Sequence, residues 1–153
     1  IGLVSTSIAK KVTPRLERIS GFKNAMATKS LAIDPEWIVA DERELLADRL
    51  QQLWDSNNRP DAFFATNDLA LIELLKFIRK NKLSIPKDIG VIAIDDSPFL
   101  EIATTPISVI KQPSFSIGKD AAQTLQSLIS SSSLEAEYET KRYAPELVAR
   151  EST

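Results

Sequence analysis

Polar side chains follow four short apolar runs of this sequence, and they are the groups with which the chain could do chemistry. They supply hydroxyls, carboxylates and an amide: Ser5, Thr6, Ser7, Asp41, Glu42, Asn67, Asp68, Asp95, Asp96 and Ser97. Arg18, in the helix predicted after the first run, adds a guanidinium. Ligands of open parallel sheets bind at the edge where the carboxyl ends of the strands meet. The pattern predicts a polar crevice for a small molecule rich in hydroxyls or other heteroatoms.

Two of these groups also have structural interpretations. Asn67 and Asp68 could cap the helix that follows them, and this is the interpretation we favour for the pair taken alone. Arg18 is of a type that usually forms surface ion pairs, here with Glu17 or Asp41. A binding role becomes more plausible than these structural roles only because several such groups converge on one edge. Their convergence does not identify the ligand.

The pair Asp95-Asp96 has three interpretations. Two adjacent carboxylates could act as an acid–base pair or could hold Mg²⁺. A solvated turn before Pro98 is the commonest structure for such a pair. The sequence leaves these alternatives open.

The composition excludes several kinds of site. The chain of 153 residues has no cysteine and no histidine, which excludes disulfide scaffolds, cysteine nucleophiles, serine–histidine triads and histidine-ligated metals. Its 19 Lys and Arg against 21 Asp and Glu give no electrostatic signature of binding to nucleic acid or to an anionic membrane. Carboxylate, amide, hydroxyl and cationic chemistry remain open to this chain, as does binding without chemistry. The start at Ile1 rather than Met suggests a fragment.

Short apolar runs alternate with amphipathic segments along the chain. The runs at 1–4, 37–40, 62–65, 89–94 and 107–110 predict strands, and residues 143–150 predict an extended tail. Helices are predicted at 14–28, after Asp41 through Leu53, from 68 to about 81, and at 114–130. This alternation is typical of βαβ units, so we predict an α/β fold, a three-layer sandwich with a mostly parallel sheet.

Local signals place the helix starts. Thr13 precedes Pro14 and is predicted to cap the first helix. Asp41 with Glu44 three residues later resembles a capping box, which predicts the start of the second helix.

The helix predicted from 68 to 81 carries an unusually wide apolar surface. At ~100° per residue, its apolar side chains span roughly 160° of the helix circumference. They are Ala70, Leu71, Leu74, Leu75, Phe77 and Ile78, and Ile72 widens the arc further. The helix is either deeply buried in the core or shared between the core and a homodimer interface, and we favour the dimer.

Five segments in register carry a resemblance to a known family. They are Arg15–Phe22, Pro60–Ala70, Ile85–Asp96, Pro106–Pro113 and Pro145–Ser152. Together they resemble the effector-binding core of lactose-repressor/galactose-repressor (LacI/GalR) transcription regulators, whose fold is a type I periplasmic-binding-protein-like lobe. The closing Pro-Glu-Leu-Val-x-Arg-x-Ser segment favours regulators over the periplasmic sugar-binding proteins that share the fold.

The resemblance implies a domain organisation. Residues 1–110 correspond to the C-terminal lobe, 111–140 to a crossover helix that would join a missing N-terminal lobe, and 141–153 to the return strand. The helix-turn-helix domain that binds operator DNA is absent from this sequence. The helix at 114–130 would pack on the missing lobe, so we expect it to dock on a neighbouring chain or to pack differently from the family.

The resemblance also implies particular binding residues. Arg18 matches an arginine that grips effector polar groups, and Asn67 and Asp95 match residues that hydrogen-bond effector hydroxyls. Ser7, after the first strand, completes the predicted set. Glu42 stands where many members place an aromatic residue that stacks on the effector. A carboxylate cannot supply that stacking surface, which argues against a standard sugar or purine pose and leaves open a more polar or cationic effector, or a phosphorylated partner elsewhere in the cleft.

The resemblance places a dimer interface on the wide apolar helix, in agreement with the arc argument, and adds a position just beyond the fourth strand. The residues assigned to it are Leu71, Ile72, Leu75, Ile78 and Ile102.

Together with the resemblance, these observations imply the effector-sensing part of a cytoplasmic, homodimeric transcription regulator that has no membrane partner. This interpretation includes no catalytic residue, no metal and no cofactor. A small polar molecule, sugar-like or related, would shift the lobe angle and so change operator affinity. One alternative is a periplasmic sugar-binding receptor of a transport system. A second is an enzyme with an Mg²⁺ site built from Asp95, Asp96 and Asp41, with Lys111 nearby.

Overall fold

The computed structural model describes residues 1–7, 9, 12–130 and 140–153 of the chain. Its strands are β1 Gly2–Thr6, β2 Ile38–Asp41, β3 Ala62–Ala65, β4 Gly90–Ile94, β5 Ser108–Lys111 and β6 Glu146–Val148. Its helices are α1 Thr13–Thr28, the 3₁₀ turn η1 Pro35–Trp37, α2 Arg43–Asp55, α3 Asp68–Lys80, the short α4 Pro98–Glu101 and α5 Ser114–Ser130.

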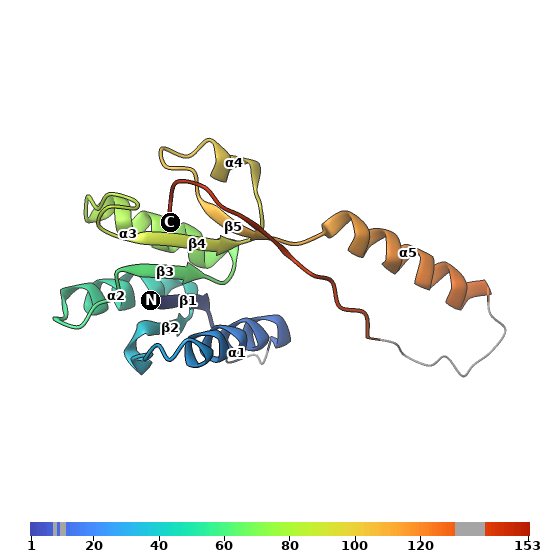
Figure 1. Ribbon diagram of the computed structural model, residues 1–153, viewed down its shortest axis with the longest axis horizontal. Coiled ribbons are helices and arrows are strands. Elements are labelled where there is room, and N and C mark those ends of the chain that lie inside the picture. The colour runs from blue at the N-terminus through green and yellow to red at the C-terminus, as the bar shows by residue number, and fades with distance from the viewer. Residues whose placement is uncertain (8, 10–11, 131–139) are drawn as a thin grey trace.

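The six strands form one sheet in the order β2-β1-β3-β4-β5-β6 (Figure 1). The first five strands are parallel, and β6 pairs antiparallel with β5 through Val109 opposite Val148. The order 2-1-3-4-5 is that of a doubly wound α/β sheet. The predicted α/β fold with a mostly parallel sheet is confirmed.

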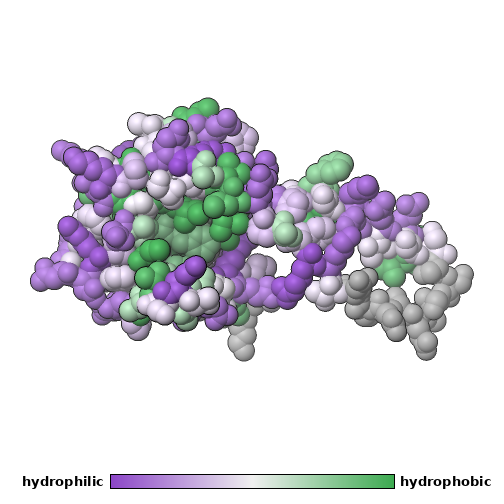
Figure 2. Space-filling model, in the orientation of Figure 1, coloured by the Kyte–Doolittle hydropathy of each residue, from purple (hydrophilic) through white to green (hydrophobic). Residues whose placement is uncertain are grey.

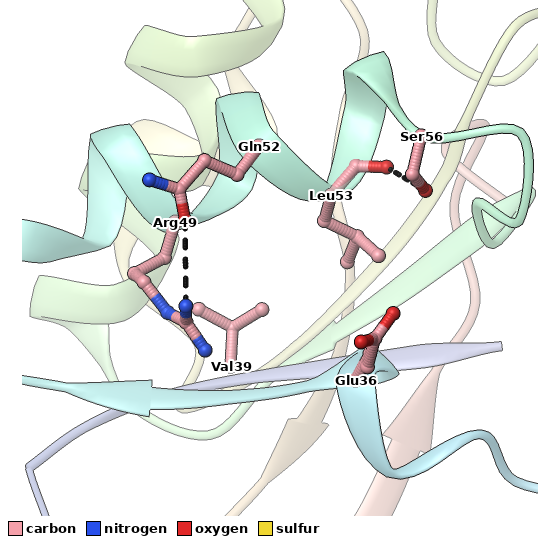
Figure 3. Close-up of a pocket in the computed structure, with 6 residues that line it drawn as sticks. All are labelled: Glu36, Val39, Arg49, Gln52, Leu53 and Ser56. Atoms are coloured by element: carbon pink, nitrogen blue, oxygen red, sulfur yellow. Dashed lines mark hydrogen bonds between the residues drawn. The ribbon is translucent and has the colours of Figure 1, made fainter.

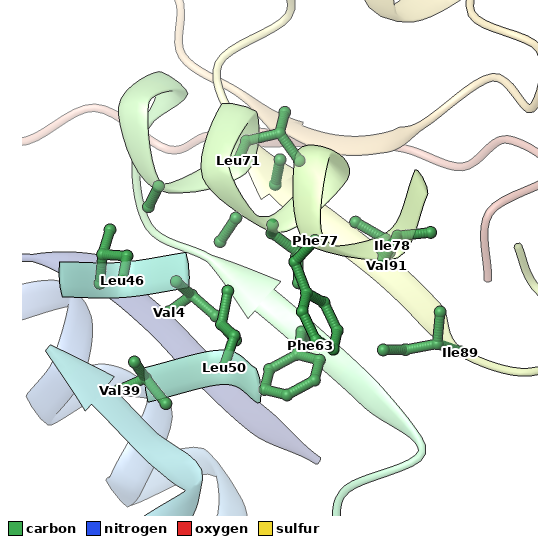
Figure 4. Packing of buried hydrophobic residues seen from close by; sticks show 14 of the residues in the cluster. Val4, Val39, Leu46, Leu50, Phe63, Leu71, Phe77, Ile78, Ile89 and Val91 are labelled. Atoms are coloured by element: carbon green, nitrogen blue, oxygen red, sulfur yellow. The ribbon is translucent and has the colours of Figure 1, made fainter. Parts of the chain in front are cut away.

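The main core lies between the sheet and the helices α2 and α3 (Figure 4). Strand side chains alternate between faces, so Phe63 of β3 and Val91 of β4 point to this side. They meet the apolar faces of the two helices, whose buried members are Leu46, Leu50, Leu53, Ala70, Leu71, Leu74, Phe77 and Ile78. Burial on this scale explains why α3 needs so wide an apolar arc.

The opposite face of the sheet carries α1. Phe22 of α1 stacks on Phe64 of β3 with ring centroids 6.1 Å apart, and Met26 is buried beside it. Helices therefore lie on both faces, which gives the three layers predicted.

The first strand is longer than the sequence predicts. It continues through Ser5 and Thr6, which are buried within the sheet, whereas the sequence predicts that the strand ends at residue 4. Both are small enough to fit, and their hydroxyls are satisfied: the Ser5 hydroxyl donates to the Thr6 carbonyl oxygen, and Thr6 Oγ1 accepts from Asn67. Of the polar residues in this run, only Ser7 lies beyond the strand.

Two predicted helix caps are wrong. Helix α1 begins at Thr13 itself with Val12 in the cap position and no side-chain cap. Helix α2 begins at Arg43 after Glu42, because Asp41 ends β2 and turns its carboxylate to the Glu42 amide. Asp41 does not form the predicted capping box, because it is the last residue of β2 and Glu42 occupies the cap position of α2.

Helix α5 stands away from the body of the domain (Figure 1). None of its side chains is buried. Of the serine-rich loop predicted after it, residues 131–133 lie outside the described residues. The chain then returns along the extended segment 140–145 into β6 and ends against the sheet.

Candidate functional site

The ends of β1, β3 and β4 lie next to one another at one edge of the sheet, with α1 beside them. Arg18 of α1 donates from Nη1 to the carbonyl oxygen of Thr66 at 2.7 Å, which fixes its guanidinium at the end of β3. Arg15, one turn earlier, donates to the carbonyl oxygen of Ser7 at 2.7 Å. Arg18 therefore belongs to this edge and does not form the surface ion pair considered for it.

Asn67 uses its whole side chain at this edge. Its Oδ1 accepts from the Ala70 amide at 3.0 Å and caps α3, as the structural interpretation expects. Its Nδ2 donates to the hydroxyls of Thr6 and Thr66 at 3.2 and 3.3 Å. The amide is thus held in one orientation across the ends of β1 and β3.

Asp95 follows β4 in a left-handed backbone conformation with φ of 73°. Such a conformation is uncommon for a residue other than glycine and is often found at functional sites. Two bonds hold it to the next strand: its amide donates to the carbonyl oxygen of Ile110, and its Oδ1 accepts from Gln112 Nε2 at 2.5 Å. Gln112, which the sequence analysis did not single out, therefore contacts a residue of the candidate site.

The carboxyl group of Asp68 is partly buried and lies within reach of the negative charge of Asp95. The pKa of Asp68 is raised above its usual value, mainly by partial burial and to a smaller extent by the negative charge of Asp95. Two carboxylates so placed would be stabilised by donors or by a cationic group of a ligand.

Asp96 is paired with cations and is not part of a solvated turn. Arg150 Nη2 lies 2.7 Å from its Oδ1 and Lys111 Nζ lies 3.7 Å from its Oδ2. The hydrogen bond from Arg150 is the main reason why the pKa of Asp96 is lowered. A carboxylate neutralised in this way is a poor candidate for binding Mg²⁺.

Asp41 and Glu42 lie apart from Asp95 at the outer strand β2. Two strands separate β2 from β4, so their ends are about 14 Å apart at ordinary strand spacing. That separation is too large for Asp41 and Asp95 to share one metal ion, and Asp41 instead lies 3.9 Å from Arg49. Glu42 is exposed at the rim. Within the described residues, no three acidic side chains are grouped as a metal site would need.

A small pocket of about 180 Å³ lies elsewhere, between α2 and the outer strand β2 (Figure 3). It is lined by Glu36, Val39, Arg49, Gln52, Leu53 and Ser56. None of the predicted effector residues lines it, so it is separate from the edge that carries them.

The residues predicted for a dimer interface divide into two groups. Leu71 and Ile78 are buried in the core of this domain. Ile72 and Leu75 are partly buried, and Ile102 is 84% exposed just after α4. The prediction from the wide apolar arc of α3 included both core and surface residues, because helical periodicity alone does not distinguish them.

Comparison with known proteins identifies the family. The sequence model of the periplasmic binding protein-like domain matches residues 1–153. The chain belongs to this family. Among its curated relatives is the probable HTH-type transcriptional regulator EndR of Paenibacillus polymyxa, 34% identical over 82% of this chain and 37% of the relative. The ribose operon repressor of Haemophilus influenzae is 30% identical over 99% of this chain and 45% of the relative.

Solved structures of periplasmic binding protein-like domains agree with the fold. A LacI-type transcriptional regulator from Bacillus cereus subsp. cytotoxis superposes with a TM-score of 0.86 at 20% identity, covering 99% of this chain and 53% of that structure. The predicted resemblance to LacI-type regulators is confirmed. This chain spans about half the length of such proteins or less.

Among the described residues, no helix is both long enough and apolar enough to cross a bilayer.

Proposed function

We propose that this chain is the effector-sensing part of a LacI-type transcriptional regulator. It would bind a small polar molecule and control the affinity of a separate helix-turn-helix domain for operator DNA. The relatives named as repressors support this function over that of a periplasmic transport receptor. A cytoplasmic location and the absence of covalent chemistry belong to the same proposal.

The observation that carries the proposal is the arrangement at the ends of β3 and β4. Arg18, Asn67 and Asp95 offer a cation, an amide and a carboxylate along one edge, each held by hydrogen bonds to the main chain or to neighbouring side chains. Groups fixed in this way recognise hydroxyls and heteroatoms without a large loss of side-chain entropy on binding. Ser7 and Glu42 would border the same edge.

The proposed mechanism is a shift between lobe angles. Residues 1–110 form the lobe that carries the site, and the crossovers through 111–140 and 141–153 would connect it to a first lobe. An effector that contacts both lobes favours the angle at which it binds better, and this shift in population changes operator affinity.

A homodimer through α3 and the segment after α4 is part of the proposal. Ile72, Leu75 and Ile102 are the predicted interface residues that a partner could reach. A charge at an interface of this kind is strongly unfavourable. We expect Ile102→Asp to lower dimer affinity of the intact regulator in sedimentation measurements, whereas Glu101→Asp, a conservative change at the neighbouring position, should leave the affinity unchanged.

The effector site is tested by titration. A thermal-shift screen of the intact regulator with monosaccharides, disaccharides and nucleobases would identify a ligand, and calorimetry would then compare Arg18→Ala and Asp95→Asn with the wild type. Loss of a charge-assisted hydrogen bond costs about 1.5–3 kcal/mol, so each variant should bind at least roughly tenfold more weakly. The variant Arg142→Ala, an exposed arginine outside this edge, is the control. Unchanged affinity in both site variants would show that the site lies elsewhere.

A further inference from the structure

Two hollows of this domain differ in their chemistry and in their place. Figure 2 shows hydrophobic surface gathered in a hollow of the body, and the apolar groove beside α1 has Arg18 of the candidate effector site among its lining residues. The small pocket between α2 and β2 shares no residue with that site (Figure 3). It lies at the outer strand β2, whereas the proposed crossovers leave the sheet through β5 and β6 at its opposite side. The small pocket is therefore a separate place for a ligand.

The small pocket has a cation and an anion on either side of an apolar floor. Val39 of β2 and Leu53 of α2 form the floor, and both are buried. Arg49 of α2 stands on one side of Val39 (Figure 3). Glu36 of η1 lies on the other side, beneath the end of α2 at Ser56 (Figure 3).

Neither charged group of the pocket is fully used by the protein. Arg49 Nη1 donates to Gln52 Oε1 at 3.3 Å, and Arg49 Nε lies 3.9 Å from Asp41 Oδ2, which is too long for a hydrogen bond. A guanidinium has five N–H donors, so most of its capacity remains available. The Glu36 carboxylate makes no hydrogen bond or ion pair within the described part of the chain, where only the Glu36 amide is bonded, to Asp34 Oδ1.

The two opposite charges define the chemistry of a ligand. A simple anion would be attracted by Arg49 and repelled by Glu36, and a simple cation would meet the reverse. A zwitterion satisfies both groups at once. The carboxyl end of α2, which carries partial negative charge, adds to the attraction for an ammonium group beside Glu36. The volume of about 180 Å³ equals that of about six water molecules, which suits a small amino acid.

We propose that this pocket binds a free α-amino acid with a small side chain. The ligand's carboxylate accepts hydrogen bonds from Arg49, its ammonium donates to Glu36, and its side chain packs on Val39 and Leu53. Binding involves no covalent step. The site is distinct from the effector edge and from the dimer interface proposed on α3, so the proposal does not depend on the proposed function.

Nuclear magnetic resonance tests this binding directly. The nitrogen-15-labelled 153-residue chain is titrated with L-alanine and with L-serine to about 10 mM, a range that suits the weak affinity of a small ligand with exposed charged partners. We expect saturable shifts of the main-chain amide signals of Val39, Leu53 and Ser56.

Two analogues of the ligand separate the contributions of its charges. N-acetyl-L-alanine lacks the ammonium group, and L-alaninamide lacks the carboxylate. Each loses a charge-assisted hydrogen bond, so each should bind about tenfold more weakly than L-alanine or not at all.

Variants of the two charged residues test the same contacts from the protein side. Glu36→Gln and Arg49→Gln should each weaken binding of L-alanine about tenfold. Both side chains are exposed, so the variants should keep the fold, which circular dichroism checks. The matched controls Glu17→Gln and Arg142→Gln remove one charge of each sign from an exposed ion pair outside the pocket, and they should leave the affinity unchanged.

The absence of saturable shifts at the pocket with both amino acids would overturn the proposal. So would equal affinity for L-alanine and its two analogues, because the charges would then play no part. Shifts confined to the neighbourhood of Arg18, Asn67 and Asp95 would also overturn it, since the amino acid would then bind at the effector edge. The first two results leave the proposed function unaffected, which the titration of Arg18 and Asp95 variants tests separately.

Discussion

Arg150 Nη2 donates a hydrogen bond to Asp96 Oδ1 at 2.7 Å, although the two residues are 54 positions apart in the chain. The guanidinium also donates from Nη1 to the Ile107 carbonyl oxygen at 2.7 Å. The pair ties the last residues of the chain to the end of β4, next to Asp95 of the proposed site. Both side chains are largely buried, with 13% and 18% exposure.

Removing Arg150 should therefore destabilise the domain. In Arg150→Ala, the carboxylate of Asp96 keeps only the more distant Lys111, and the Ile107 carbonyl loses a donor. We expect a loss of about 2–3 kcal/mol in the free energy of unfolding measured with urea. Arg142→Ala, which removes an exposed ion pair with Glu17, should change it by less than about 1 kcal/mol. Equal effects of the two variants would contradict this role for Arg150.

The stabilisation by the Asp96–Arg150 ion pair should depend on pH in the acid range. The folded-state pKa of Asp96 lies below its unfolded value of about 3.9, so its contribution to stability is complete above that pH. The contribution is lost as the pH falls through the lowered pKa, because only the ionised carboxylate binds Arg150. The difference in unfolding free energy between wild type and Asp96→Asn should be constant from about pH 7 to 5 and should shrink below about pH 4. A difference that grows on acidification would contradict the assignment.

The positions of Asn67 and Asp95 could be predicted from sequence because each follows an apolar run of parallel-strand type. Strand ends of a parallel sheet share an edge, and the residues at those ends are brought together without further information. The partner of Asp96 could not be predicted in the same way. Arg150 reaches it through the antiparallel pairing of β6, which depends on how the returning chain crosses the sheet.

Helix α3 shows another limit of sequence analysis. Its periodicity gives the width of the apolar arc but does not tell how deeply the sheet and α2 bury each part of it. Leu71 and Ile78 therefore looked like interface residues and lie in the core. Gln112 was missed for a similar reason, since a glutamine after a strand carries no local signal of the carboxylate that it meets.

Gly2 and Gly21 should respond in opposite ways to alanine. A Cβ at Gly2 would lie 2.6 Å from Phe63 Cε1 and 2.9 Å from Pro60 Cγ, and Phe63 is itself locked in the core. Gly2→Ala should cost about 1–3 kcal/mol of stability, as overpacking does. A Cβ at Gly21 in α1 meets nothing within 4 Å. Gly21→Ala should gain about 0.5–1 kcal/mol through helix propensity. Urea unfolding of the two variants measures both, and two losses of similar size would contradict this account of the packing.

Asn67 has a structural role that can be separated from a binding role. Asn67→Ala removes the cap of α3 and should cost about 1–2 kcal/mol of stability. Asn67→Ser keeps a capping oxygen and should recover most of that loss, while the amide donor remains absent. Thermal denaturation gives the stabilities, and effector titration of the intact regulator gives the affinities. Weak binding in both variants, with stability restored only in the serine variant, is the result expected of a residue with both roles. Full affinity in the serine variant would show that the amide does not contact the effector.

The central claim is that this domain senses an effector for a transcription regulator, and the coding DNA upstream of Ile1 tests it most directly. Sequencing of that DNA should show a helix-turn-helix domain of about 60 residues followed by a lobe of about 100, as domain sizes of this kind require. A hydrophobic leader that ends in small residues would contradict the claim, because an exported protein of this fold would be a solute receptor.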